Sequence, residues 1–216
     1  MTSTTLTRAG TTRGVPTRTL LTAGAAAGPL FLGLSFAQVL TRDGFDLSRQ
    51  PLSLLALGEH GWIQIGNFVL SGLLALAGAA GLRRALRGGP AGTWGPALVA
   101  VLGAGLIIAG VLRADPSMGW PAGAPDGAPE TMSWHSVGHG VGAMLSFGSL
   151  TIASLVFARR FGRVGALLSV FVVVATVVVM AWPDQDSISV RMAVGSTLIF
   201  GWLTAVSLHT LTERNH

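Results

Sequence analysis

The chain contains no cysteine, no lysine and no tyrosine, and it has few charged residues of any kind. Without cysteine it cannot form disulfides, use a thiolate nucleophile or bind zinc through sulfur. Without lysine and tyrosine it lacks Schiff-base lysine and tyrosine general-acid chemistry. Charged residues make up 11% of the 216 residues and the mean hydropathy is +0.61, whereas soluble domains carry about a quarter charged residues. This composition predicts a membrane protein.

The basic residues do not form a surface for nucleic acid. All 14 are arginines, and they are scattered between apolar runs with no clustered patch or aromatic platform that could follow a phosphate backbone. The expected partners are therefore the lipid bilayer and a small-molecule or lipid ligand, and nucleic acid is excluded. The sequence predicts no oligomeric state.

Six apolar runs are long enough to cross a bilayer, since about 20 residues at a rise of 1.5 Å each span about 30 Å of hydrocarbon. The first run exceeds the roughly 7 to 15 residues of a signal-peptide core, so we expect it to be retained as a helix. The sequence therefore predicts an all-α fold, an integral membrane bundle of six transmembrane helices over residues 19–211. A basic tail, 1–18, is expected to be disordered, and a short tail follows at 212–216. The predicted spans are 19–40, 62–82, 94–112, 135–158, 164–182 and 191–211.

The arginines predict the orientation of this bundle. With six spans, ten of the 14 arginines and Glu213 fall on the side of the termini, while the other side receives four arginines and the remaining eight acidic residues. Arginine in short loops stays on the cytoplasmic side. We therefore expect a multi-pass protein of the cell membrane with both its N-terminus and its C-terminus in the cytoplasm.

Two outer connections are unusually long, at about 20 residues each, and loops of that length are usually functional or disordered. They read RDGFDLSRQPLSLLALGEHG and RADPSMGWPAGAPDGAPETMS. Within the first, SLLALG is expected to form a short amphipathic turn on the membrane surface. Function is expected on this outer side.

Short patterns predict how the helices meet. GAAAG at 24–28 and GHGVG at 138–142 have the GxxxG spacing that lets helices approach closely, and we expect both to serve packing. The outer helix ends LTRDGFD, VLRADPS and AWPDQDS resemble one another. They fit either a threefold hairpin repeat or the general preference of membrane boundaries for Asp, Trp and small residues.

Polar side chains from every helix reach one level near the outer ends. Polar groups at that depth are costly unless they face the bundle interior or a wet cavity. The sequence predicts a water-filled cup that opens outward, is covered by the two long connections and binds a small molecule, a lipid headgroup or a partner. The alternative is that these residues cap helices and reach headgroups, with the arginines paired to nearby aspartates. The candidate lining residues are Gln38, Gln64, Asn67, Arg113, Asp115, His135, His139, Asp184 and Arg191.

The stretch SWHSVGHG, residues 133–140, places two histidines four apart on one helix face. Such a pair can bind a metal ion when a third ligand is added, for which Asp115 is a candidate. The HExxH motif is absent because Ser136 follows His135. The alternative is two neutral imidazoles at a wet interface, hydrogen-bonded to loop carboxylates. Zinc is thus the one candidate cofactor, and the sequence leaves open whether the protein is an enzyme.

Three hypotheses for function follow. The first is a binding or sensing module with an outward cup. The second is an intramembrane enzyme that holds a metal through His135, His139 and an outer carboxylate and acts on a lipid-like substrate. The third is a small transporter, although the inner helix halves offer no Asp or Glu to relay protons.

The runs FDLSRQPLSLLALGEHGWIQIGNFVLSGLL, RADPSMGWPAGAP and SWHSVGHG resemble the bacterial six-helix membrane proteins catalogued as a domain of unknown function, DUF998. The resemblance extends from about residue 20 to 211. It implies a six-helix fold and an integral-membrane location. It implies no activity and no catalytic residue.

Overall fold

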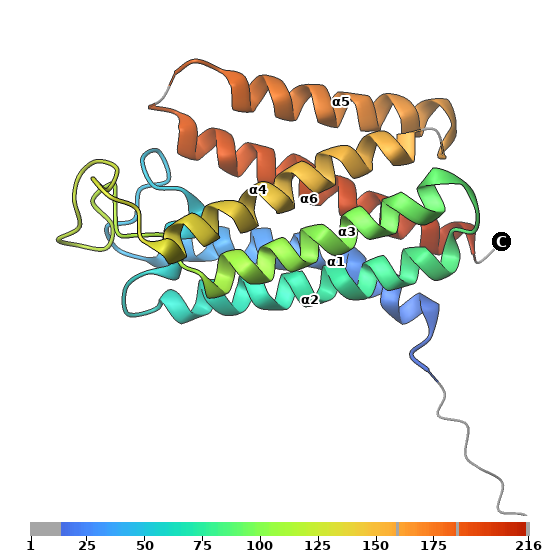
Figure 1. Ribbon diagram of the computed structural model, residues 1–216, viewed down its shortest axis with the longest axis horizontal. Helices are drawn as coiled ribbons and strands as arrows, with labels where there is room; N and C mark the ends of the chain where they lie inside the picture. Colours follow the sequence, from blue (N-terminus) through green and yellow to red (C-terminus); the bar gives the residue numbers. More distant parts are fainter. Residues whose placement is uncertain (1–13, 159, 185, 215–216) are drawn as a thin grey trace, which may run out of the picture.

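The chain folds into six long helices and one short 3-10 helix (Figure 1). The computed structural model describes residues 14–158, 160–184 and 186–214, so most of the predicted tail 1–18 and residues 215–216 lie outside the described part. The predicted all-α fold with six long helices is confirmed within these residues. The elements are α1 (Thr17–Thr41), η1 (Leu52–Ala56), α2 (Gly61–Ala85), α3 (Gly89–Val111), α4 (Trp134–Ala158), α5 (Gly162–Ala181) and α6 (Ile188–Glu213).

The start of α3 differs most from the predicted boundary of residue 94. Gly88 and Gly89 have φ angles of 75° and 66°, which suit glycine, and Pro90 follows in the first turn. Proline is favoured there because the first N–H groups of a helix have no intrahelical partner. The helix therefore starts at Gly89.

The helices indicate a multi-pass membrane protein. Five of them, all except α5, are long and apolar enough to cross a membrane, and α5 contains a shorter apolar segment, Gly165–Ala181. On α5, Leu167, Leu168 and Phe171 are exposed at the bundle surface. Large apolar side chains on the outside suit a lipid environment rather than water.

Glycine lets neighbouring helices approach closely. A Cβ placed on Gly78 of α2 would lie 2.5 Å from the Cα of Gly24 on α1, so a side chain at either position would push the two helices apart. Gly28 similarly faces the carbonyl oxygen of Phe200 on α6, and Gly142 of α4 faces the backbone of Gly105 on α3. The packing role predicted for GAAAG and GHGVG is confirmed.

The helices pack in chain order from α1 to α4, and α6 returns to lie against α1. Helix α5 lies at the edge, beside α4 and α6 (Figure 1). The main apolar core runs through α1, α2, α3, α4 and α6. Toward the end of the bundle that carries the termini, α4 and α6 meet through Phe157 and Trp202, whose ring centroids are 5.6 Å apart.

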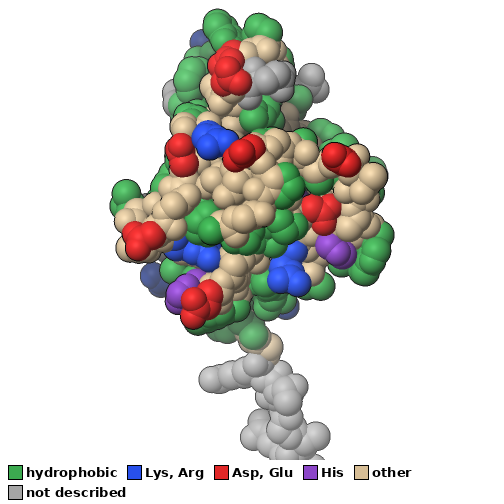
Figure 2. All heavy atoms as spheres, turned by 90° about the vertical axis from the view of Figure 1, so that its left-hand side faces the viewer, with side chains coloured by type: hydrophobic (Ala, Val, Ile, Leu, Met, Phe, Trp, Pro, Cys, Tyr) green, Lys and Arg blue, Asp and Glu red, His purple; other side chains and the backbone are tan. Residues whose placement is uncertain are grey.

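The two ends of the bundle differ in charge. The acidic end consists of the connections 42–60, 112–133 and 182–187, which hold eight of the nine acidic residues. Figure 2 shows their carboxylates spread across this face. The basic end carries the start of α1, the end of α6 and the short connections after α2 and α4.

Residues 42–60 and 112–133 form a compact structure, here called the cap, over the acidic end. Its apolar cluster contains Phe45, Leu52, Leu54, Leu55, Leu57 and Trp120, together with Ala193 of α6. The Trp120 Nε1–H donates to the Leu54 carbonyl at 3.0 Å. Gln50 Nε2 donates to the Met118 carbonyl at 2.9 Å and so joins the two connections.

The expectation that SLLALG lies on the membrane surface is wrong. Its residues 53–56 belong to η1, and Leu54 and Leu55 are only 2% and 0% exposed. Leucines project on several sides of this short helix, so it has no polar face to keep at the headgroups. It is buried beneath the rest of the cap.

Candidate functional site

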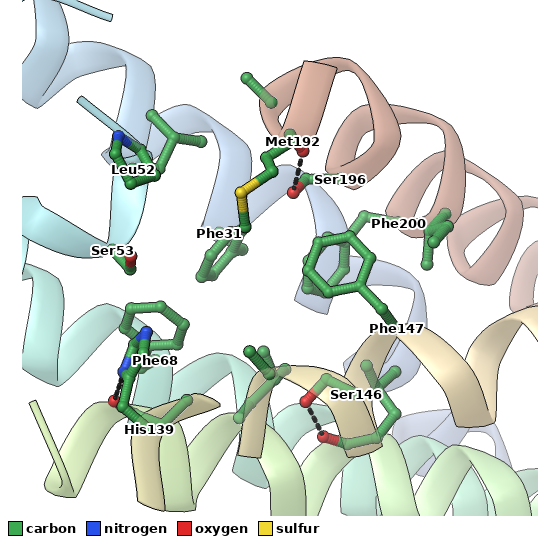
Figure 3. A pocket seen from close by; sticks show the side chains of 17 residues that line it. Phe31, Leu52, Ser53, Phe68, His139, Ser146, Phe147, Met192, Ser196 and Phe200 are labelled. Carbon is green, nitrogen blue, oxygen red and sulfur yellow. Dashed lines mark hydrogen bonds between the residues drawn. The ribbon is translucent and has the colours of Figure 1, made fainter. Parts of the chain in front are cut away.

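A pocket lies beneath η1 and extends toward the middle of the bundle. The empty space within it measures about 640 Å³, including the part open to the surroundings. Helices α1, α2, α3, α4 and α6 and the segment Pro51–Ser53 line it, whereas no described residue of α5 does. Its walls are mostly apolar and include Phe31, Phe68, Phe147, Met192, Ile199 and Phe200 (Figure 3).

Aromatic rings form the wall on the α1 and α2 side. Phe31 stacks on Phe200 with a centroid distance of 4.8 Å and meets Phe68 edge to face at 5.1 Å. Offset and edge-to-face arrangements are the favourable geometries for such pairs. This wall is therefore fixed by ring packing.

Of the candidate site residues predicted from the sequence, His139 lines this pocket. It is 8% exposed, and its Nδ1 lies 2.7 Å from the carbonyl oxygen of Ala109 on α3. A carbonyl only accepts, so Nδ1 carries the hydrogen, and Nε2 of the neutral ring is an acceptor. Figure 3 shows that second nitrogen on the pocket side of the imidazole.

Three hydroxyl groups also line the pocket, but two of them are already bonded. Ser146 Oγ donates to the Gly142 carbonyl at 2.9 Å, and Ser196 Oγ donates to the Met192 carbonyl at 2.8 Å. Ser53, from η1, is the third. The pocket thus presents one imidazole acceptor and the Ser53 hydroxyl in apolar surroundings.

Gln38, Gln64 and Asn67 do not line this pocket, so the structure does not bring the predicted cup residues together around one cavity. Gln64 and Asn67 are 0% and 1% exposed and belong to a network between α1 and α2. Gln38 Nε2 donates to Gln64 Oε1 at 2.7 Å, and Gln64 Nε2 donates to Ser35 Oγ at 3.0 Å. Asn67 Nδ2 donates to the Phe31 carbonyl at 3.0 Å. These amides bond one another across a helix interface, which offsets most of the cost of burying them, while Gln38 Oε1 has no partner among the described residues.

A family model described as "Protein of unknown function (DUF998)" matches residues 25–209. The chain belongs to the DUF998 family. The resemblance found in the sequence is thereby confirmed over nearly its whole length. Neither a curated protein nor a solved structure matched the chain.

At the rim of the DUF998 bundle, Asp115 and Ser133 form the N-terminal cap of α4. Asp115 accepts hydrogen bonds from the Ser133 hydroxyl at 2.5 Å and from the Ser133 backbone N–H at 2.8 Å. Ser133 Oγ in turn accepts from the N–H of Ser136 at 3.2 Å. The Ser133 side-chain and backbone hydrogen bonds lower the pKa of the Asp115 carboxyl, with a smaller contribution from nearby His135. This arrangement is typical of helix capping.

His135 belongs to the same rim and not to the pocket. Its Nδ1 lies 2.8 Å from Ser133 Oγ, 3.2 Å from the Arg113 carbonyl and 3.7 Å from Asp115 Oδ1. The Arg113 side chain is exposed. The alternative that these residues cap a helix at a wet interface therefore describes His135 and Asp115 well, whereas the predicted Arg113–Asp115 pair is not among the ion pairs of the described residues.

Arg191 caps the end of α5. Its guanidinium donates to the carbonyls of Val179 at 3.2 Å and Met180 at 3.4 Å, and also to those of Trp182 and Asp184. A cation suits this position because the last carbonyls of a helix lack partners and carry partial negative charge. The Asp184 carboxylate is exposed, and its hydrogen bonds with Ser187 and Asp186 lower its pKa. The predicted alternative paired Arg191 with an aspartate, and its actual partners are backbone carbonyls.

The described residues hold no group of three or more His, Asp and Glu side chains arranged to bind a metal ion. His135 and His139 share a helix, but each Nδ1 has its own partner in a different place, at the rim and on α3. Zinc binding through His135, His139 and Asp115 therefore gains no geometric support.

Proposed function

We propose that this protein binds a small, mostly apolar molecule that carries one hydrogen-bond donor, in the pocket beneath η1. The observation that carries the proposal is the buried imidazole of His139, which offers an acceptor in a mostly apolar enclosure. Ligand pockets combine apolar walls with a few placed polar groups, and this pocket has the same combination. A hydroxyl or amide on the ligand would complete the hydrogen bonding of the ring.

We further propose that the protein works in the cell membrane, with the acidic end outside and both termini in the cytoplasm. The segregation of ten arginines from eight acidic residues supports this orientation. The ligand would then be held in the outer half of the bilayer.

Paired ligands test the binding site. Native mass spectrometry of the detergent-purified protein would compare a long-chain alcohol with the alkane of the same length. We expect the alcohol to bind more tightly, because only its hydroxyl can donate to His139 Nε2. A neutral hydrogen bond contributes about 0.5 to 1.5 kcal/mol, so the difference should be up to about tenfold in Kd.

Two variants separate the roles of the two ring nitrogens. His139→Asn keeps a donor near Nδ1 for the Ala109 carbonyl but removes the Nε2 acceptor, so it should abolish the preference for the alcohol. His135→Asn, at the rim, is the matched control and should preserve it. Equal binding of alcohol and alkane by the unaltered protein would refute the proposal.

A further inference from the structure

We infer that the ligand is a membrane lipid that enters the pocket sideways, between α4 and α6, from the leaflet at the acidic end. This inference rests on the proposed function and specifies its ligand class. It follows from which sides of the pocket are closed.

Three of the helix pairs around the pocket are sealed by glycine contacts. Cβ atoms built on Gly78, Gly72 and Gly142 would lie 2.5, 2.6 and 2.7 Å from the backbones of α1, α3 and α3 respectively. Backbones this close leave no room for a chain to pass between them. The α1–α2, α2–α3 and α3–α4 seams are therefore closed.

The cap closes the pocket toward the water at the acidic end. Leu52 and Leu55 of η1 are 7% and 0% exposed, and Trp120 packs over the same cluster. Arg42 stabilises the cap by donating hydrogen bonds to the Leu55 and Leu57 carbonyls. A ligand coming from water would have to displace this whole cluster.

The α1–α6 side is closed as well, since a Cβ on Gly28 of α1 would lie 2.8 Å from the Phe200 carbonyl oxygen of α6. The remaining side lies between α4 and α6. These helices meet near the basic end at Phe157 and Trp202, and they cross rather than run parallel (Figure 1). Nearer the acidic end, Ala143 and Phe147 of α4 and Met192 of α6 line the pocket and are only half-buried. No described residue of α5 joins the lining there.

The gap is apolar. Ala143, Phe147 and Met192 line it, and Met144, next to Ala143 on α4, is 67% exposed. In a membrane these side chains contact hydrocarbon, so an opening between them admits lipid chains in preference to polar solutes.

The polar and apolar parts of the pocket also follow the same order along α4 as the headgroup and chain of a lipid in a bilayer. His139 lies five residues into α4 and Phe147 eight residues further, which correspond to about 7 Å and about 12 Å along the helix. Trp134, at the start of α4, is exposed, as is typical of a residue at the headgroup level. A lipid would therefore place its donor group at His139, near the interface, and its chain along Phe147 toward the bilayer centre.

Photo-cross-linking tests this route. The protein would be reconstituted in phosphatidylethanolamine and phosphatidylglycerol vesicles that contain phosphatidylglycerol with a diazirine in its acyl chain, and adducts would be mapped by mass spectrometry. We expect adducts on the inward-facing Phe31 and Ile199 in addition to those on the outer surface.

Three changes distinguish entry between α4 and α6 from entry through the cap. Ala143→Trp should reduce pocket adducts roughly tenfold, while Ala205→Trp, on an exposed face of α6, should not. Met192→Ala widens the gap and should increase them, which keeps the test valid if Ala143→Trp folds poorly. Gln50→Cys with Met118→Cys, joined by a short bis-maleimide in this cysteine-free chain, locks the cap and should change nothing.

Each contrary outcome has a definite meaning. Loss of pocket adducts in the locked cap, or no response to Ala143→Trp and Met192→Ala, would overturn lateral entry. Binding of the long-chain alcohol in detergent without any pocket adduct from vesicles would overturn the lipid assignment while leaving the proposed function intact. Absence of both would overturn both.

Discussion

Replacing Arg42 by methionine tests how firmly the cap is held over the pocket. Arg42 follows the end of α1, and its guanidinium donates to the carbonyls of Leu55 at 2.5 Å and Leu57 at 2.8 Å. Its Cζ also lies 5.1 Å from the ring centroid of Trp120. Burial lowers the pKa of Arg42 below its ordinary value, but a guanidinium stays charged at neutral pH.

The magnitude follows from these contacts. A hydrogen bond to a charged group contributes about 1.5 to 3 kcal/mol, and a cation–π contact contributes about 0.5 to 1 kcal/mol at an exposed site. Arg42 is only partly buried, so the low end of each range applies. Because methionine retains the apolar stem, the loss is roughly 3 kcal/mol in the free energy of opening the cap, or about a hundredfold in the opening equilibrium.

Hydrogen exchange measures this opening directly. The amides of Leu54 and Leu57 are bonded to the Pro51 and Leu54 carbonyls, and their exchange should become about a hundredfold faster in Arg42→Met. Amides within α3 should be unaffected.

Arg49→Met is the matched control. Arg49 pairs with Asp126 at 3.8 Å, but the two side chains are 54% and 95% exposed, and such pairs contribute about 0 to 1 kcal/mol. In this variant, the hydrogen exchange of the Leu54 and Leu57 amides should change by less than about fivefold. If both variants exchange alike, the apolar cluster alone holds the cap and the reasoning about Arg42 is wrong.

Three further changes test the packing, the rim and the buried network. Gly78→Leu should lower stability by about 1 to 3 kcal/mol, because its side chain overpacks the α1–α2 seam, whereas Gly33→Leu, which projects into open space, should have little effect on the thermal midpoint. Hydrogen bonds from Ser133 lower the folded pKa of Asp115, so the stability they give is complete above the unfolded pKa of about 3.9 and is lost as the pH falls through the folded value. Asp115→Asn should therefore be less stable than the unaltered protein at pH 7, and thermal scans should show the difference shrinking toward pH 3. Asn67→Leu should reduce stability by about 1 to 2 kcal/mol without changing the binding of the long-chain alcohol. A loss of binding in this variant would instead show that Asn67 belongs to the ligand site.

The helices and the charge distribution were predictable because the bilayer constrains them strongly. Crossing hydrocarbon requires long apolar runs with every backbone group bonded internally, and six such runs are visible in the sequence. Arginine and acidic residues divide between the connections just as clearly. These features follow from composition along the chain and need no knowledge of which helix faces which.

The pocket lining was not predictable for the opposite reason. Phe147 lines the pocket, while Phe171 is exposed on the outside of α5, and nothing in the sequence around either distinguishes them. A membrane helix is apolar on both its lipid face and its buried face, so helical periodicity carries little information. The sequence predicted that Gln64 and Asn67 lie near one end of their helix, but it could not predict the direction in which their side chains point. They point at α1 and bond its side chains and backbone.

The distribution of glycine explains where the pocket forms. Wherever two helices of the first four meet, glycines such as Gly72 and Gly103 bring the backbones into contact and leave no space. The half of α6 nearest the acidic end lacks such contacts: a Cβ on Gly195 would meet only the Met180 sulfur, at 3.7 Å. Helix α6 is therefore held away from α4 by side chains such as Phe147 and Met192, which leave gaps between them, and the empty space lies against α6 for this reason. Such a wall can shift by changing rotamers, whereas the glycine seams cannot, so we expect a ligand to be accommodated by movement of α6 side chains against a rigid wall formed by α1 to α4.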